Sequence, residues 1–287
     1  MNFVENAYAK INVFLDVTGI LPDGYHSIKT VMQSVSLCDT LYMDVEPSGK
    51  TEIVLSTHGG DRIPEDESNL VWRAVKLYLE RAGVCASVNV RLEKRIPVGA
   101  GLGGGSSDAA SALRVMNRVF SAFDAVGLSA LAATLGSDVA FCLASGAALC
   151  EGRGEIITPI ELPPLHLVIA IGEGRVSTPA AYRALDERFS RFDGSVESDG
   201  DKAFADLMPS LRGEADRLFN IFEEAIIPIC PEISDIKSAL MKCGASAALM
   251  SGSGAAVFGI FGSEQSARDA AAALRGKGYF AEYSTSV

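Results

Sequence analysis

The chain has 287 residues, of which 48% are apolar, and a formal net charge of −11. Such a composition excludes a disordered chain and leaves room for two modest domains or one large one. The acidic balance argues against a nucleic-acid surface, which would carry a basic stripe. No apolar run reaches the ~18 residues of a membrane helix and the first residues lack a signal-peptide pattern, so we expect a cytoplasmic protein.

The first half of the chain alternates between strand and helix patterns. Period-two apolar runs predict strands at 10–17, 31–35, 40–45 and 88–92, and a hairpin at 147–150 and 155–159. Helical spacing predicts helices at 69–82, 107–120 and 128–135. Ser137 is expected to cap a further helix, with Asp138 in its first turn.

The pattern restarts near residue 160. Strands are predicted at 166–171, 245–251, 255–261 and 279–283, and helices at 179–189, 204–211, 220–227, 232–242 and 264–276. A loop rich in Asp, Gly and Ser is expected at 192–202. Strands and helices interleave without regular βαβ repeats, which favours an α+β protein with domains at 1–157 and 158–287.

The most informative segment is PVGAGLGGGSSDAASAL at residues 97–113, with five glycines between positions 99 and 105. A backbone without Cβ atoms folds closely around a ligand, and the helix expected after it presents free N–H groups and a positive dipole end. This combination is typical of phosphate binding. A flexible linker fits poorly, because Leu102 and the apolar flanks indicate a packed turn.

Other glycine motifs fit this loop less well. A Walker P-loop needs a lysine before its serine, and Gly105 precedes Ser106 here. Gly99, Gly101 and Gly104 match the dinucleotide pattern, and Asp124 lies about 20 residues on, where a ribose-binding acid is sought. Asp124, however, reads as a helix start and not as the end of a second strand.

The loop resembles that of the GHMP small-molecule kinases, P-x-x-x-G-L-G-S/G-S-S/A. The residues that fall on this motif are Pro97, Gly101, Leu102, Gly103, Gly104, Gly105, Ser106 and Ser107. The segments AYAKIN at 7–12, GILPDGYH at 19–26 and GSDVAF at 136–141 resemble the branch that phosphorylates 4-diphosphocytidyl-2-C-methyl-D-erythritol. MSGSGAAVF at 250–258 is similar to the third glycine motif of that branch.

The resemblance implies a two-domain GHMP kinase fold. Residues 1–157 would form a ribosomal protein S5-like ATP-binding and catalytic domain, and 158–287 a ferredoxin-like substrate-binding domain. The γ-phosphoryl group of ATP would pass to the 2-hydroxyl of the cytidyl substrate. Mg²⁺ would be held mainly by phosphate oxygens, with Ser107 as the one candidate protein ligand. The residues expected to bind ATP are Pro97, Val98, Gly99, Ala100, Gly101, Leu102, Gly103, Gly104, Gly105, Ser106 and Ser107.

By the same resemblance, Asp138 either accepts the proton of the hydroxyl group or only orients that group, and Lys10 steadies the developing charge. The alternative is that Asp138 only caps a helix and Lys10 is a solvated strand residue. The residues expected to bind the substrate are Asn12, Tyr25, His26, Thr178, Pro179 and Tyr182. His26 would hydrogen-bond the cytosine and Tyr25 and Tyr182 would cover its faces. Tyr182 departs from the phenylalanine that family members often carry.

Asp108 is expected to stabilise its helix N-terminus, and the SGSG turn at 251–254 to approach the phosphates or form a plain hairpin. The six cysteines read as reduced packing residues, and the three histidines are too dispersed for a zinc site.

The expected partners are ATP and a small molecule, without nucleic acid or membrane. The protein is expected to be a monomer or a weak homodimer. The rivals are a mevalonate, homoserine or sugar kinase, a non-catalytic nucleotide sensor and a dinucleotide-dependent oxidoreductase.

Overall fold

The computed structural model describes residues 1–189, 204–211 and 218–287. Contacts divide the chain into two compact units. Unit 1 contains Met1–Lys10, Leu37–Val98 and Gly103–Ser145, and unit 2 contains Ile11–Ser36, Gly99–Leu102 and Gly146–Val287. Because neither unit is one stretch of chain, they do not test the boundary between residues 157 and 158, which stays a prediction.

Two long strands, β1 (Asn2–Ile20) and β2 (His26–Pro47), contribute residues to both units. In unit 1, β2 pairs antiparallel with β4 (Ala86–Glu93), and β4 pairs in parallel with β3 (Glu52–His58). The strand expected at 10–17 is confirmed and extends further, whereas the two expected at 31–35 and 40–45 form one strand. An aspartate is disfavoured in a strand, but Asp39 is accommodated in β2 because it pairs with Lys94.

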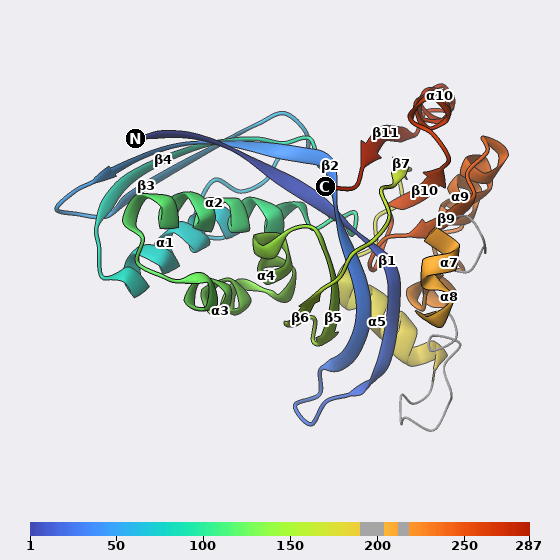
Figure 1. Ribbon diagram of the computed structural model, residues 1–287, viewed down its shortest axis with the longest axis horizontal. Coiled ribbons are helices and arrows are strands. Elements are labelled where there is room, and N and C mark those ends of the chain that lie inside the picture. The colour runs from blue at the N-terminus through green and yellow to red at the C-terminus, as the bar shows by residue number, and fades with distance from the viewer. Residues whose placement is uncertain (190–203, 212–217) are drawn as a thin grey trace. The chain divides into compact units, whose positions relative to one another are not determined.

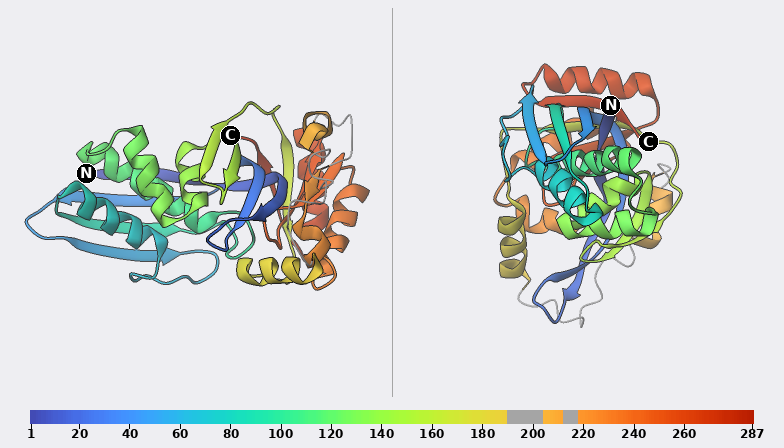
Figure 2. Two further views of the ribbon diagram at one scale, coloured as in Figure 1. Left: turned by 90° about the horizontal axis from the view of Figure 1, so that it is seen from below. Right: turned by 90° about the vertical axis from the view of Figure 1, so that its left-hand side faces the viewer.

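The helices of unit 1 are α1 (Leu70–Ala82), α2 (Gly104–Phe120), α3 (Ala125–Leu135) and α4 (Ser137–Ala144). They gather on one face of the strands of this unit (Figures 1 and 2). Three expected helix starts in this unit are wrong. α2 begins at Gly104 and not at Ser107, and α3 begins at Ala125 and not at Leu128. Ser137 is the first helical residue of α4, after the N-cap Gly136. Asp124 caps α3 by accepting the Gly127 N–H, as the helix-start interpretation requires.

Unit 2 contains the rest of β1 and β2 and a second sheet. β5 (Ala147–Gly152) pairs with β2 and forms the expected hairpin with β6 (Ile156–Pro159), and β8 (Phe219–Asn220) pairs in parallel with β1. The second sheet has the order β11 (Phe280–Thr285), β7 (His166–Ile171), β10 (Val257–Phe261) and β9 (Ala247–Met250), with antiparallel pairing throughout. These pairings confirm the α+β class.

The helices described in unit 2 include α5 (Thr178–Arg188), α7 (Leu207–Leu211), α8 (Phe222–Ile226), α9 (Glu232–Lys242) and α10 (Glu264–Arg275). α9 and α10 pack against the second sheet around an apolar core, and Figure 2 shows α10 lying along the sheet. The helix expected at 220–227 is shorter because Asn220 belongs to β8. The loop expected at 192–202 lies outside the described residues. Within the described ranges, no helix is long and apolar enough to cross a membrane.

Candidate active site

The glycine-rich loop between β4 and α2 is packed, as the sequence predicts. Ala100 and Leu102 are each 1% exposed, so side chains on alternate residues anchor the loop to the protein. Val98 is exposed, and its N–H donates to Asp61 Oδ2 at 3.1 Å. The intervening glycines therefore carry the part of the loop that a ligand can approach through backbone alone.

In unit 2, the loop is hydrogen-bonded to the SGSG turn at residues 251–254. Ser251 Oγ donates to the Gly101 carbonyl oxygen at 3.1 Å, and the Ala256 N–H donates to the Ala100 carbonyl oxygen at 3.0 Å. A methyl group on Gly101 would lie 2.3 Å from the Ser251 carbonyl oxygen. The turn is thus part of the support of the loop, which favours the expected role beside the phosphates over a plain hairpin.

Sequence reasoning missed Asn220, which holds this turn. Its Nδ2 donates to the carbonyl oxygens of Met250 and Gly252, each at 2.8 Å, and the residue is 4% exposed. One buried amide therefore fixes two carbonyls of the turn. A lone asparagine before an apolar run gives no motif, so only the fold reveals this role.

Replacing Gly101 with alanine is expected to lower the free energy of unfolding by about 2–4 kcal/mol, from left-handed strain plus overpacking against the Ser251 carbonyl. Gly99→Ala is the matched control, because Gly99 also has a positive φ of 68° but a methyl group there meets nothing within 4 Å. The measurement is urea unfolding of both variants. Equal losses would show that contact with the turn does not constrain position 101.

Unit 1 brings together the predicted catalytic residues. Lys10 lies on β1 and Asp138 in the first turn of α4, with Lys10 Nζ 3.6 Å from Asp138 Oδ2. Lys10 is 4% exposed, whereas the Asp138 side chain is 36% exposed. A methyl group on Gly103, at the N-cap of α2, would lie 2.9 Å from Lys10 Cγ. The lysine stem therefore packs on the glycine loop, and the carboxylate remains open to a ligand.

Two neighbouring residues are less suited to chemistry. Burial, reinforced by the Asp138 charge, raises the pKa of the Cys142 thiol far above its ordinary range, so Cys142 is a neutral packing residue. Ser107 is 1% exposed, and its Oγ donates to the Gly104 carbonyl oxygen at 2.9 Å. That hydroxyl is engaged within its own helix, which does not favour Ser107 as a metal ligand.

In unit 2, an aromatic cluster forms around His26. The His26 ring lies 4.6 Å from the Tyr182 ring, which in turn meets Phe222 edge-on at 4.9 Å. His26 Nε2 lies 2.7 Å from Asp186 Oδ1, a partner that the sequence analysis missed. The structure thus brings together His26 and Tyr182, the predicted hydrogen-bonding and stacking residues.

Tyr25 occupies the turn before β2 and is 60% exposed. The Arg153 guanidinium group lies 4.1 Å from the centre of its ring and pairs with Asp23 in the same turn. Tyr25 N–H donates to Asp23 Oδ1 at 3.1 Å, and this bond orders the turn. No ring contact joins Tyr25 to His26 or Tyr182 among the described residues.

The other predicted substrate residues lie around the SGSG turn of unit 2. Thr178 begins α5 and its Oγ1 is 3.0 Å from Ser253 Oγ, while Pro179 follows in the first helical turn. Asn12 is 2% exposed, and its Nδ2 donates to Thr30 Oγ1 at 2.8 Å. Asn12 N–H also donates to Ser251 Oγ at 3.3 Å, which connects β1 to the turn.

Comparison with known proteins identifies the family. The models "GHMP kinases N terminal domain" and "GHMP kinases C terminal" match residues 69–146 and 202–279. A 4-diphosphocytidyl-2-C-methyl-D-erythritol kinase of Deinococcus radiodurans is 41% identical over 93% of this chain and 87% of its own length. One of Pelotomaculum thermopropionicum is 42% identical over 94% and 92%. The chain belongs to the 4-diphosphocytidyl-2-C-methyl-D-erythritol kinase family of GHMP kinases.

Solved structures agree with this membership of the 4-diphosphocytidyl-2-C-methyl-D-erythritol kinase family. A crystal structure of 4-(cytidine 5'-diphospho)-2C-methyl-D-erythritol kinase is 37% identical, covers 99% of both chains and has a TM-score of 0.82. A mevalonate kinase of L. major, 17% identical over 99% of this chain and 95% of its own, has a TM-score of 0.75, which shows a shared fold alone. The expected two-domain α+β GHMP kinase fold is therefore confirmed.

Proposed function

We propose that this chain transfers the γ-phosphoryl group of ATP to the 2-hydroxyl of 4-diphosphocytidyl-2-C-methyl-D-erythritol. The observation that carries the proposal is the Lys10 and Asp138 pair, packed against Gly103 of the glycine loop in a chain of this family. Phosphoryl transfer asks for a positioned triphosphate, compensation of developing charge and a group that receives the alcohol proton. The loop, Lys10 and Asp138 offer one of each.

The glycine loop and the start of α2 are suited to the triphosphate. The first N–H groups of a helix have no partner within the helix and carry its positive dipole end. α2 begins with two glycines, so no side chain shields these donors. In a protein with a net charge of −11, such local positive elements offset the repulsion of an anionic ligand.

In the reaction, the substrate hydroxyl oxygen bonds to the γ-phosphorus while the bond from that phosphorus to the bridging oxygen of ADP breaks. Asp138 takes the hydroxyl proton, for which its partial exposure gives the alcohol access. The Lys10 ammonium group, held on β1 beside this carboxylate, compensates charge on the reacting oxygens. ADP and the phosphorylated alcohol leave.

Mg²⁺ bound to the phosphate oxygens of ATP would supply charge neutralisation. The protein offers little for it: among the described residues, no group of three His, Cys, Asp or Glu side chains could hold a metal ion. Ser107 keeps its hydroxyl on Gly104.

The His26 cluster is the proposed cytosine site. A neutral, flat base needs an aromatic face and a few well-placed polar atoms. Tyr182 offers the aromatic face, and the neighbouring His26 ring offers the polar atoms. The Asp186 carboxylate lies beside Nε2 of His26 and so orients the imidazole ring. Tyr25, Asn12, Thr178 and Pro179 remain proposed contributors.

Changing His26 to phenylalanine is expected to raise KM for the cytidyl substrate roughly tenfold, with KM for ATP unchanged, because the ring remains but a polar contact is lost. His166→Phe is the matched control, since His166 also stacks on a tyrosine, Tyr283, in unit 2. Steady-state kinetics with each substrate varied will check this. If both variants raise both KM values alike, His26 has no special role with the base.

A coupled ATPase assay comparing the cytidyl substrate with mevalonate, homoserine and galactose tests the proposed function itself. Turnover is expected with the cytidyl compound alone. Preferential turnover of another alcohol would contradict the proposal and favour a rival GHMP kinase. The cytoplasmic location and the monomer or weak homodimer stay predictions.

A further inference from the structure

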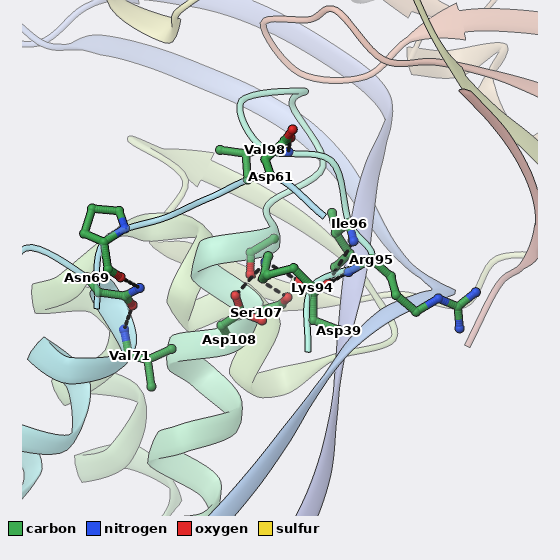
Figure 3. Close-up of polar contacts among 12 residues, drawn as sticks. Asp39, Asp61, Asn69, Val71, Lys94, Arg95, Ile96, Val98, Ser107 and Asp108 are labelled. Carbon is green, nitrogen blue, oxygen red and sulfur yellow. Dashed lines mark hydrogen bonds and ion pairs between the residues drawn. The ribbon is translucent and has the colours of Figure 1, made fainter. Parts of the chain in front are cut away.

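A buried ion cluster lies beneath the glycine loop in unit 1. Lys94, directly after β4, donates from Nζ to Asp39 Oδ2 on β2 and to Asp108 Oδ2 on α2, the latter at 2.7 Å (Figure 3). The side chains of Lys94, Asp39 and Asp108 are only 2%, 0% and 1% exposed. The cluster cannot bind a ligand directly at such burial, so its function has to be sought in what it holds.

Asp39 holds the start of the loop. Its Oδ1 accepts the N–H of Arg95 at 2.5 Å and the N–H of Ile96 at 2.8 Å. These two residues directly precede Pro97, where the loop begins. One carboxylate therefore fixes the last backbone amides before the loop.

Asp108 and Gly104 hold the far end of the loop on the same lysine. Asp108 lies in the second turn of α2 and has no capping role, so the expectation that it stabilises the helix N-terminus is wrong. A methyl group on Gly104 would lie 3.4 Å from Lys94 Nζ and 3.0 Å from Ile96 Cγ2. The first turn of the helix thus rests directly on Lys94 and Ile96.

We propose that Lys94, Asp39 and Asp108 form a positioning clamp that holds the two ends of the ATP loop at a fixed separation. The inference rests on the proposed function, because the loop is taken to bind ATP. Lys94 connects β2 to α2, and Asp39 extends the connection to the backbone of Arg95 and Ile96. A loop preorganised in this way loses less conformational freedom when the triphosphate binds.

The charge of the clamp fits its place under an anion site. Asp108 Oδ1 has no hydrogen-bond partner among the described residues. Burial raises the pKa of Asp108 to about 8, opposed by Lys94 and assisted by the Asp39 charge. With a proton on Asp108, one ammonium faces one carboxylate and the cluster is neutral. It then adds no negative charge under the helix end that receives phosphate.

Asp108→Ala is expected to weaken binding of a non-hydrolysable ATP analogue tenfold or more, with binding of cytidine diphosphate unchanged, both by isothermal titration calorimetry. The variant leaves Lys94 paired with Asp39, so no buried charge is stranded. Asp108→Asn is the conservative rescue: its amide oxygen still accepts from Lys94, and affinity for the analogue should stay within about twofold of the parent. Should Asp108→Ala not fold, Asp108→Ser, too short to reach Lys94, replaces it.

Glu5→Ala is the matched control, because Glu5 pairs with Arg114 and Arg118 further along the same helix without touching the loop. It is expected to lower stability and leave affinity for the analogue unchanged. A folded Asp108→Ala or Asp108→Ser with the affinity of the parent, or one that weakens cytidine diphosphate equally, would overturn the clamp. A parent that binds the analogue but does not phosphorylate the cytidyl substrate overturns the proposed substrate and leaves the clamp standing.

The titration of Asp108 gives a further prediction. In the unfolded chain its pKa returns to about 3.9, so between about pH 4 and pH 8 the folded protein holds a proton that the unfolded chain lacks. This contribution to the free energy of unfolding therefore falls as pH rises through that window. The groups that face Asp108 are Lys94 and Asp39, with the neutral Cys142 thiol nearby.

Asp108→Asn removes this titration. Urea unfolding at pH 5.5 and pH 8.5 should show the variant gaining stability relative to the parent at the higher pH. A difference between the two proteins that is the same at both pH values would contradict the assignment of a proton to Asp108.

Discussion

Replacing Asp138 with asparagine is expected to lower kcat by roughly 10²- to 10⁴-fold, the range that a positioned general base contributes. The amide keeps the shape of the side chain but cannot take the hydroxyl proton. Asp138 is 36% exposed in the first turn of α4, so the fold should survive the change. The measurement is kcat by coupled assay, together with the circular dichroism melting curve.

Asp124→Asn is the matched control for this variant. Asp124 also lies at the start of a helix in unit 1, where its carboxylate caps α3, and asparagine is an equally good cap. Its kcat is expected to equal that of the parent. Near-normal turnover in Asp138→Asn would remove Asp138 from the chemical step and leave it with the role of orienting the hydroxyl group.

Replacing Lys10 with methionine is expected to lower kcat by roughly 10²- to 10³-fold, as for the loss of one preorganised charge-stabilising donor. Methionine keeps most of the apolar stem, which packs on Gly103, so the loop remains supported. KM for ATP should change much less than kcat if the ammonium group acts mainly in the transition state.

The double variant Lys10→Met with Asp138→Asn distinguishes joint from separate action. The two groups lie 3.6 Å apart, so we expect them to act in one step. The double variant should then be scarcely slower than the slower single variant, because effects of residues that act as a unit are not additive. Fully multiplicative losses would show that the two residues contribute independently.

Much of the fold could be predicted because the local patterns were strong. Asn69 and Gly83 delimit α1, and the alternating apolar residues of β4 lead directly into the loop. The start of α2 was missed because glycine has the lowest helix propensity of the ordinary residues, apart from proline. Gly104 and Gly105 are nevertheless helical, since the turn rests on Lys94 and Ile96.

The candidate site was predicted in its motif residues but not in its supports. Lys10 and Asp138 come from segments more than a hundred residues apart and were paired only through the resemblance. Asn220, Asp186 and the clamp of Lys94, Asp39 and Asp108 carry no local signal, since each depends on a contact distant in sequence. Periodicity reports on neighbours along the chain and cannot reveal such pairings.

The absence of a side chain at Gly103 gives Lys10 its place. Gly103 has a φ of 67°, and a methyl group there would lie only 2.9 Å from Lys10 Cγ, so we expect any other residue at this position to displace the lysine side chain. A saturation library at position 103 should therefore yield folded proteins that fail as kinases although every ionisable group remains. Such variants would carry their substitution in the nucleotide loop. Their kinetics, however, would resemble those of a variant that lacks the Lys10 ammonium group.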